Sequence, residues 1–179
     1  MLRMQRSIPL SKFSNYKIGG PAKYFSESRN YSELKEAVEW AKEEGEKIFI
    51  LGGGTNLLIS DHGFSGFVLK PGFSTLSTNR TKVTVGAGVL VSDLLNFTVQ
   101  KELSGLEWAG GLPGTVGGAI YGNAGAFGGE IKDSLESVES FDINDLKKVK
   151  RANRECHFEY RSSLFKEHRG EEIILTAVF

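Results

Sequence analysis

Cysteine is nearly absent from this sequence, since Cys156 is the only one among 179 residues. A single thiol excludes an internal disulfide framework and suits a protein of a reducing compartment. Long hydrophobic runs are absent too, because no segment approaches the roughly 20 apolar residues that a membrane span requires. The opening stretch MLRMQRSIPLSKF also lacks the apolar core of a signal peptide. We therefore expect a cytoplasmic protein without a membrane partner.

An excess of charge of either sign is missing as well. Lysine plus arginine and aspartate plus glutamate number 22 each, so the formal net charge is zero. Nothing in that balance favours nucleic acid or an anionic membrane, and any polyanionic ligand must be held by local geometry. The most basic stretch, LKKVKRANR at 146–154, contains no aromatic side chains for base stacking. We expect it to be a solvated hairpin.

Groupings typical of metal sites and of hydrolases do not occur in the sequence either. His157 directly follows Cys156, which is not the spacing of a zinc site, and His62 and His168 are isolated. The Ser-Asp-His run at 60–62 has no Gly-x-Ser-x-Gly elbow around it. We therefore predict no bound metal and reject a serine hydrolase.

What the sequence has in abundance is glycine: 22 residues, nine of them within the 21 positions 110–130. Glycine loses more backbone entropy on folding than any other residue. Such a concentration therefore indicates places where the backbone turns sharply or comes close to another group. The remaining composition, with 40% hydrophobic residues, is that of a folded protein.

The first part of the chain has the pattern of a β-α-β unit. The segment 32–45 predicts a helix, with Ser32 as its N-cap and Gly45 as its stop. Its apolar stripe, at the spacing i, i+3, i+4, i+7, consists of Leu34, Ala37, Val38 and Ala41. Three short segments read as strands: 22–27, 47–51 and 67–70. The second of these strands runs directly into a glycine turn, which is a typical ligand-facing location.

A second lobe is predicted after the turn-rich stretch 71–79. The segment 92–105 repeats the helix pattern, with Ser92 as N-cap and Gly105 as stop. Four segments read as strands, the second and third joined by the basic hairpin: 82–88, 135–143, 155–160 and 172–179. The prediction is an α+β (or α/β) fold in two lobes, with one glycine loop in each.

The first glycine loop is ILGGGTNLL at 50–58. It lacks the Gly-Lys-Ser/Thr of a P-loop, and Leu57 stands where a Rossmann fingerprint has its third glycine. Successive amides in such a turn can hold an anion without a lysine. Thr55 and Asn56 add short polar groups that can donate to an oxygen. The loop therefore predicts a phosphate-binding turn.

The second glycine loop, at 110–130, contains a helix start in its Pro-Gly-Thr run at 113–115. Free amides in a first helical turn attract a phosphate or the electron-rich edge of a ring. Tyr121 and Phe127 could contact such a ring or pack in the core. Taken singly, each tract could be simple turn chemistry. Two tracts in adjacent lobes favour an elongated ligand between the lobes, such as a dinucleotide, without saying which one.

Four ordered stretches resemble a single family. They are NYKIGGPAKYF (15–25), LGGGTNLLISD (51–61), GLPGTVGGAIYGNAGAFGGE (111–130) and YRSSLFK (160–166). They resemble the UDP-N-acetylenolpyruvoylglucosamine reductase family, also called UDP-N-acetylmuramate dehydrogenases or the MurB family. The resemblance covers nearly the whole chain. It implies a two-lobed FAD-binding domain of the vanillyl-alcohol-oxidase (PCMH) type, with lobe 1 at 1–75 and lobe 2 at 76–179.

The resemblance implies an FAD site made by both glycine loops. The first loop would cradle the pyrophosphate through Gly52, Gly53, Gly54, Thr55 and Asn56. The second would line the dinucleotide and the flavin through Gly111, Pro113, Gly114, Thr115, Gly117, Gly118, Asn123, Gly125 and Ala126. Some flavoproteins of this fold attach the flavin to a histidine beside the first loop. Thr55 and Asn56 occupy that region here, so FAD would be bound non-covalently.

The segment 160–165, Tyr-Arg-Ser-Ser-Leu-Phe, matches the family's Tyr-Arg-x-Ser-x-Phe motif, whose arginine is catalytic. The family uses NADPH, through FAD, to reduce UDP-N-acetylglucosamine enolpyruvate to UDP-N-acetylmuramate for peptidoglycan. It thereby serves the cell wall, cell shape and cell division. Arg161 would bind the substrate carboxylate and stabilise the charge that develops there. The alternative for Arg161 is a surface ion pair with Glu159 or Glu167.

The family continues into a substrate-binding domain, which carries a proton-donating serine and an assisting glutamate. No part of these 179 residues matches that domain, so the chain resembles the flavin half of the reductase, with the C-terminal half missing. Three hypotheses stay open. The chain is the FAD-binding part of the NADPH-dependent reductase, a flavin-binding module without turnover of its own, or an oxidoreductase of the same fold with another acceptor.

Overall fold

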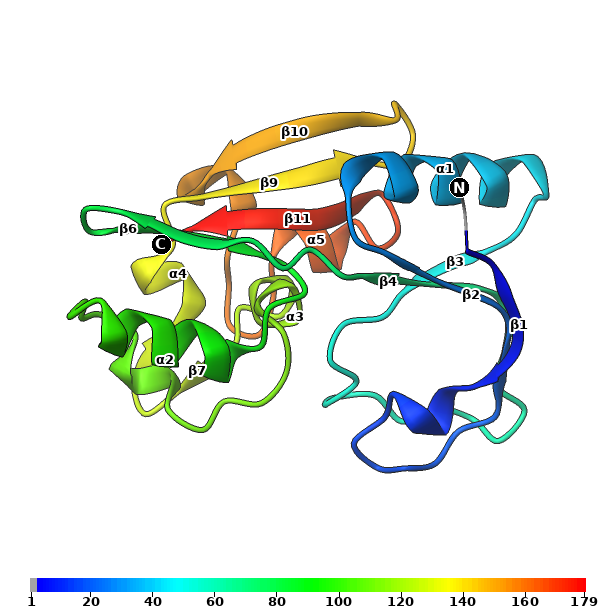
Figure 1. The fold of residues 1–179 in the computed structure, drawn as a ribbon, viewed down its shortest axis with the longest axis horizontal. Coiled ribbons are helices and arrows are strands. Elements are labelled where there is room, and N and C mark those ends of the chain that lie inside the picture. The colour runs from blue at the N-terminus through cyan, green and yellow to red at the C-terminus, as the bar shows by residue number, and fades with distance from the viewer. Residues whose placement is uncertain (1–2) are drawn as a thin grey trace. The chain divides into compact units, whose positions relative to one another are not determined.

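A computed structural model describes residues 3–179 of the chain (Figure 1). The chain divides into two compact units after Gly72, and unit 2 spans Phe73–Phe179. Each unit has its own sheet and its own buried core. No helix in residues 3–179 is long and apolar enough to cross a membrane.

Unit 1 is built on a four-stranded sheet of order β1-β2-β4-β3. Its elements are β1 (Gln5–Pro9), the 3-10 helix η1 (Leu10–Lys12), β2 (Pro21–Ser28), α1 (Tyr31–Glu43), β3 (Ile48–Ile50) and β4 (Phe64–Pro71). β2 and β3 both run parallel to β4, and β1 pairs antiparallel with β2. The three strands predicted in this part of the chain are confirmed, whereas β1 was not foreseen.

Helix α1 connects β2 to β3 and packs against β2 and β4. All four residues of the predicted apolar stripe are buried, and Gly45 follows the helix with φ +64°. The predicted N-cap is wrong. Asn30, not Ser32, caps the helix, because its side chain accepts a hydrogen bond from the Glu33 amide at 3.0 Å.

Unit 2 is built on a five-stranded antiparallel sheet of order β10-β9-β11-β6-β5. Its strands are β5 (Leu76–Asn79), β6 (Lys82–Gly86), β9 (Ser137–Asp142), β10 (Lys147–Ala152) and β11 (Glu172–Val178). β7 (Gly125–Ala126) and β8 (Gly129–Glu130) form a separate small hairpin. The helices are α2 (Val91–Gln100), α3 (Val116–Tyr121), α4 (Ile131–Ser134) and α5 (Leu164–Glu167), with 3-10 turns η2 (Glu107–Ala109) and η3 (Asn153–Cys156).

The structure corrects the strand predictions in unit 2. The segment 155–160 forms no strand, because Cys156 ends a 3-10 turn and His157 takes a left-handed φ of +46°. The basic stretch lies in a largely exposed hairpin, as expected, but it forms strand β10 itself, paired along its length with β9, and not the connection between two other strands. Within the stretch described as turn-rich, 71–79, the last four residues form strand β5, which was not predicted.

Helix α2 begins and ends at different residues from those predicted. Leu90 is its N-cap and gives no side-chain bond; the Val91 amide donates instead to the Gly114 carbonyl oxygen at 2.9 Å. The helix ends at Gln100, well before Gly105, and Glu102 adopts the left-handed φ of +56°. Main-chain partners from elsewhere in the unit therefore replace the side-chain cap that the sequence suggested.

The edge strand β10 is the most basic element of unit 2. It pairs only with β9 in the sheet. Lys148 forms an ion pair with Glu139 of β9 at 2.8 Å, and Arg151 pairs with Glu172 of β11. The basic residues are thus a charged sheet border, which agrees with the absence of stacking aromatics in this stretch.

Candidate flavin site

The first glycine loop starts where β3 ends. The Leu51 amide still donates to the Leu69 carbonyl oxygen of β4 at 2.9 Å, and the chain then leaves the sheet. Five successive amides donate to no acceptor within residues 3–179: those of Gly52, Gly53, Gly54, Thr55 and Asn56. A row of unpaired amides is a fitting partner for the oxygens of an anion. The glycine turn after this strand lies where the sequence predicts it, and its binding of phosphate stays a prediction.

Residues 13–15 of the same unit fix the shape of this loop. The Asn15 amide donates to the Gly54 carbonyl oxygen at 3.1 Å, and the Ser14 hydroxyl donates to the Leu57 carbonyl oxygen at 3.4 Å. Gly54 has φ +66°, and a Cβ there would lie only 1.7 Å from the Phe13 carbonyl oxygen. Glycine is therefore required by packing inside the unit, and the loop is shaped without a ligand.

Three large apolar side chains are exposed close in sequence to residues 13–15 and to the glycine loop at 52–56. Tyr16, Ile18 and Leu58 are 60, 48 and 79% exposed. Exposed apolar side chains next to unpaired polar groups are typical of ligand sites. The sequence did not lead us to predict a role for these three residues. Each of them lies close to glycines in the sequence, and that position was the signal that could have identified them.

The second glycine loop contains the predicted start of helix α3, with Thr115 as its N-cap. The expectation of free amides in the first turn is wrong. The Val116 amide donates to the Val89 carbonyl oxygen and the Gly117 amide to the Ala87 carbonyl oxygen, both at 2.9 Å. The amide of the third helical residue donates to the Thr115 hydroxyl at 3.3 Å. The first two of these amides connect α3 to the segment after β6, and none of the three is free to bind a ligand.

The glycines of this loop have different surroundings. A Cβ on Gly117 would lie 2.8 Å from the Ala87 Cβ, so this glycine permits close packing of α3. Gly118 is exposed. Gly111, Pro113 and Gly114 precede the helix and line a pocket of about 370 Å³ with residues at the start of α2. Those residues, Leu90, Ser92, Leu95 and Asn96, were not foreseen, because some twenty residues separate them from the loop.

Asn123 is fully buried, with φ +40°. Its Nδ2 donates to the Glu130 Oε2 at 3.0 Å and to the Glu159 carbonyl oxygen at 2.9 Å. Its Oδ1 accepts from the Lys132 amide at 3.2 Å. The side chain therefore links the end of α3 to two other segments of unit 2, and its predicted contact with the flavin stays a prediction.

The motif at 160–165 separates into buried anchors and an exposed turn. The Ser163 hydroxyl, fully buried, donates to the Tyr121 carbonyl oxygen at 2.7 Å, and Phe165 is buried in the core. Tyr160 and Arg161 form a two-residue turn, and Arg161 has φ +54°. Reciprocal main-chain hydrogen bonds of 3.1 Å between Glu159 and Ser162 close it. The anchors thus hold the arginine at the surface of unit 2.

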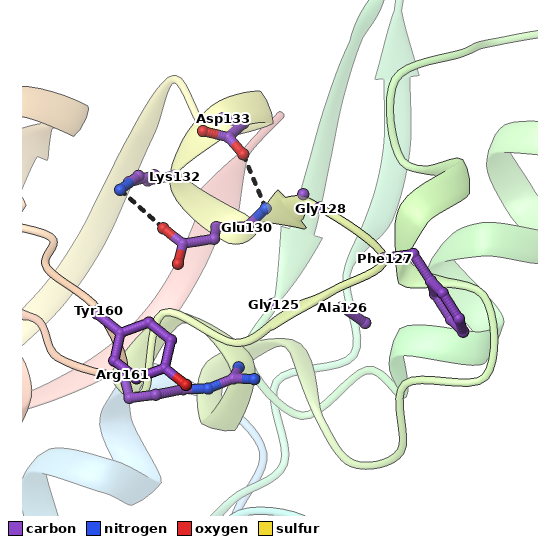
Figure 2. A pocket seen from close by; sticks show the side chains of 10 residues that line it. Gly125, Ala126, Phe127, Gly128, Glu130, Lys132, Asp133, Tyr160 and Arg161 are labelled. Carbon is purple, nitrogen blue, oxygen red and sulfur yellow. Dashed lines mark hydrogen bonds and ion pairs between the residues drawn. The ribbon is translucent and has the colours of Figure 1, made fainter.

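Figure 2 shows an open pocket of about 580 Å³ in which the Arg161 turn faces the β7–β8 hairpin. Gly125 and Ala126 form one strand of that hairpin. Phe127 lies at its tip, away from Arg161 in this view, and is 88% exposed. Tyr121 is exposed as well. Phe127 is therefore not packed in the core, whereas Tyr121 is partly covered, and the contact of either residue with a ring stays a prediction.

The charges in this pocket leave Arg161 available. No carboxylate in residues 3–179 forms an ion pair with its guanidinium, which instead lies 5.5 Å from the centre of the Tyr160 ring. The predicted alternative, a pair with Glu159 or Glu167, does not form. A hydrogen bond from Lys132 lowers the pKa of the Glu130 carboxyl below its usual value, so Glu130 is ionised at neutral pH.

Metal chemistry finds no support in the described part of the chain. Within residues 3–179, no three histidine, cysteine, aspartate or glutamate side chains gather as a metal site requires.

Comparison with known proteins assigns the chain to a class. Residues 22–145 match the model of the family described as FAD binding domain, and the chain belongs to this family. Its fold is shared with proteins of distant sequence, such as the BBE-like 1 protein of Physcomitrella patens (TM-score 0.69, 20% identity, 99% of this chain and 41% of that chain). The predicted α+β fold of the PCMH type is thereby confirmed.

Within that class, the chain is similar to proteins named UDP-N-acetylenolpyruvoylglucosamine reductase. It is 42% identical over 168 residues to the protein of Solibacter usitatus, covering 94% of this chain and 53% of that protein. For the Lactobacillus delbrueckii subsp. bulgaricus protein the values are 40% over 179 residues, 99% and 59%. The crystal structure of the reductase (MurB) from Thermus caldophilus matches with TM-score 0.84 and 32% identity, over 99% of this chain and 61% of that one. The chain thus spans little more than half the length of these relatives.

Proposed function

We propose that this chain binds FAD non-covalently and forms the flavin-carrying part of an NADPH-dependent reductase in the cytoplasm. Its substrate would be UDP-N-acetylglucosamine enolpyruvate, and its product UDP-N-acetylmuramate would serve peptidoglycan synthesis. The observation that carries the proposal is the row of five unpaired amides at 52–56 in a chain of the FAD binding domain family.

The residues present fit a dinucleotide. Unpaired main-chain amides can bind the two phosphates without a cationic side chain, which suits a chain of zero net charge. Tyr16, Ile18 and Leu58 offer exposed apolar surface in the same unit. In unit 2, the residues proposed to line the dinucleotide and flavin are Gly111, Pro113, Gly114, Thr115, Gly117, Gly118, Asn123, Gly125 and Ala126.

When bound, FAD would supply the redox chemistry, taking hydride from NADPH and delivering it to the enolpyruvyl carbon. Arg161 would bind the substrate carboxylate through its guanidinium fork and stabilise the charge that develops beside it. The absence of an ion pair at Arg161 in residues 3–179 supports this role, because the guanidinium needs no partner displaced before it binds an anion.

Titration of the purified chain with FAD tests the first part. We expect saturable binding of one FAD, quenching of flavin fluorescence, and release of intact FAD on denaturation. A folded sample without affinity for FAD would end the proposal.

A second experiment separates a reductase from a binding module, a distinction that matters because the chain spans little more than half of its relatives' length. NADPH is added anaerobically to the FAD-loaded chain, followed by the enolpyruvyl substrate. Bleaching and then recovery of the flavin colour supports the reductase. Flavin that stays oxidised, or is reduced without recovering, supports a module without turnover; recovery only with another acceptor supports a different oxidoreductase.

Arg161→Ala tests the residue role, with Arg154→Ala as a control at another exposed arginine of unit 2. We expect Arg161→Ala to slow reoxidation by the substrate while FAD binding stays near its original strength. Equal loss of both properties, or the same effect in Arg154→Ala, would contradict the assigned role.

A further inference from the structure

Two hydrogen bonds connect the C-terminal end of helix α3 to the turn that carries Arg161. The Tyr121 carbonyl oxygen, in the last residue of α3, accepts from the Ser163 hydroxyl at 2.7 Å. Two residues further on, the Asn123 Nδ2 donates to the Glu159 carbonyl oxygen at 2.9 Å. Glu159 and Ser162 close the turn around Tyr160 and Arg161, and Ser163 is the next residue along the chain. Residues 121–123 of the second glycine loop therefore contact the chain on both sides of this turn.

The hydrogen bond from Asn123 belongs to a network in which the donors and the acceptor of its side-chain amide have partners. The Glu159 carbonyl oxygen accepts both the Ser162 amide, at 3.1 Å, and the Asn123 Nδ2, so both of its lone pairs have donors. The second hydrogen of Nδ2 goes to Glu130, and the Oδ1 accepts from Lys132. The buried amide thus has both donor hydrogens engaged, in an environment where an unpaired polar group is costly.

These bonds bring three segments together at one side chain. They are the end of α3, the hairpin that carries Gly125 and Ala126, and the turn that carries Arg161. The left-handed backbone at Asn123 is one that asparagine adopts more readily than most residues. We propose that Asn123 is a positioning residue, whose buried side-chain amide sets the place of Arg161 relative to the flavin-lining hairpin. This inference rests on the proposed function, in which Arg161 binds the substrate beside the flavin.

Asn123→Gly is the variant of choice, because glycine accepts φ +40° without strain and removes only the side chain. Asn153→Ala is the matched control. Asn153 is a second asparagine of unit 2 whose Nδ2 donates to two carbonyl oxygens, those of Lys132 and Leu135, each at 2.7 Å. Neither of these bonds reaches residues 159–163, so general loosening of the unit affects both variants, whereas displacement of the turn affects only Asn123→Gly.

The first measurement is hydrogen exchange of single amides by NMR, which needs no cofactor. We expect Asn123→Gly to speed exchange of the Ser162 and Glu159 amides by about tenfold or more, while amides of the central strand β11 keep their rates. Asn153→Ala should leave the two turn amides unchanged. Unchanged turn amides in Asn123→Gly, or equal effects in both variants, would overturn the proposal.

The second measurement asks whether Asn123 acts through Arg161. Sulfite is an anion that combines reversibly with the flavin ring and bleaches its absorbance, and a guanidinium nearby strengthens its binding. In the FAD-loaded chain, we expect Arg161→Ala and Asn123→Gly each to weaken sulfite binding by about tenfold. The double variant should be no weaker than Arg161→Ala alone, since coupled residues are not additive.

The outcomes separate the two ideas. Additive losses in the double variant, or sulfite binding that Asn123→Gly leaves intact, would overturn the positioning role. Loss of FAD binding in the unchanged chain would instead end the proposed function, and the exchange measurement still decides whether Asn123 holds the turn. Should Asn123→Gly fail to fold, Ser163→Ala removes the other connection to α3 and should speed exchange of the same turn amides.

Discussion

Gly45 and Gly54 have nearly the same backbone conformation, with φ +64° and +66°, in opposite surroundings. A Cβ at Gly45 would meet nothing within 4 Å, whereas one at Gly54 would lie 1.7 Å from the Phe13 carbonyl oxygen. We predict that Gly45→Ala lowers the free energy of unfolding by about 1–2 kcal/mol, the strain of the left-handed conformation alone. Gly54→Ala should cost about 3 kcal/mol or more and abolish FAD binding. Urea unfolding measures both; equal losses would mean that the loop moves freely away from Phe13.

The thiol of Cys156 is buried in unit 2. Burial raises the pKa of its thiol from 9.0 to about 11. The folded chain therefore holds this proton more tightly than the unfolded chain. Its contribution to the free energy of unfolding is complete below about pH 9 and is lost as the pH rises towards 11.

We predict that, between pH 8 and 11, the free energy of unfolding decreases less steeply with pH in Cys156→Ala than in the unchanged chain. Lysine and tyrosine titrations are common to both proteins and cancel in the comparison. The thiol should also react with disulfide reagents only as fast as the chain opens. Parallel pH profiles, or rapid modification of the folded chain, would contradict a buried, protonated thiol.

At the scale of elements, two residues are candidates for the N-cap of α1: Asn30 in the structure and Ser32 in the sequence prediction. The Asn30 side chain accepts from the Glu33 amide, and the Glu33 carboxylate in turn accepts from the Arg29 amide at 2.8 Å. We predict that Asn30→Ala lowers the free energy of unfolding by about 1 kcal/mol, whereas Ser32→Ala changes it by less than about 0.5 kcal/mol. Chemical denaturation of the two variants gives the comparison. A larger loss in Ser32→Ala would restore the cap that the sequence suggested.

Elements whose signal is local could be predicted from the sequence. The stripe of Leu34, Ala37, Val38 and Ala41 and the apolar strands on both sides follow from spacing alone, and the structure has them where expected. The glycine-rich turn after β3 and the start of α3 at Thr115 were likewise readable. Each of these features depends on residues close together in the chain.

The errors concern elements that depend on distant partners. β10 is rich in lysine because it is a sheet border with one neighbour, and composition alone made it look like a loop. Helix α2 starts where the Gly114 carbonyl oxygen receives its first amide, a partner that no local pattern reveals. The first-turn amides of α3 looked available for the same reason, since Val89 and Ala87 are remote in sequence. The hydrogen bonds of Asn123 belong to this group too.

At the scale of the whole molecule, the two units carry different kinds of proposed site. The loop at 52–56 in unit 1 offers unpaired amides, whereas residues 111–126 in unit 2 offer glycine-lined pockets. We predict that ADP, which has the diphosphate, shifts amide NMR signals mainly in unit 1, and that riboflavin shifts them mainly in unit 2. FAD should shift both sets and bind more tightly than either fragment, because its parts are joined. Signals that move in only one unit with FAD would limit the site to that unit.

The borders of the unit 2 sheet bear on how this protein behaves when crowded. One border, β10, presents Lys147, Lys148 and Lys150, and the other, β5, is only four residues long. A neighbouring copy that tried to extend the sheet would have to bring like charges together on one side and would find too short a template on the other. Both borders of the sheet therefore disfavour the edge-to-edge strand pairing from which fibrils grow.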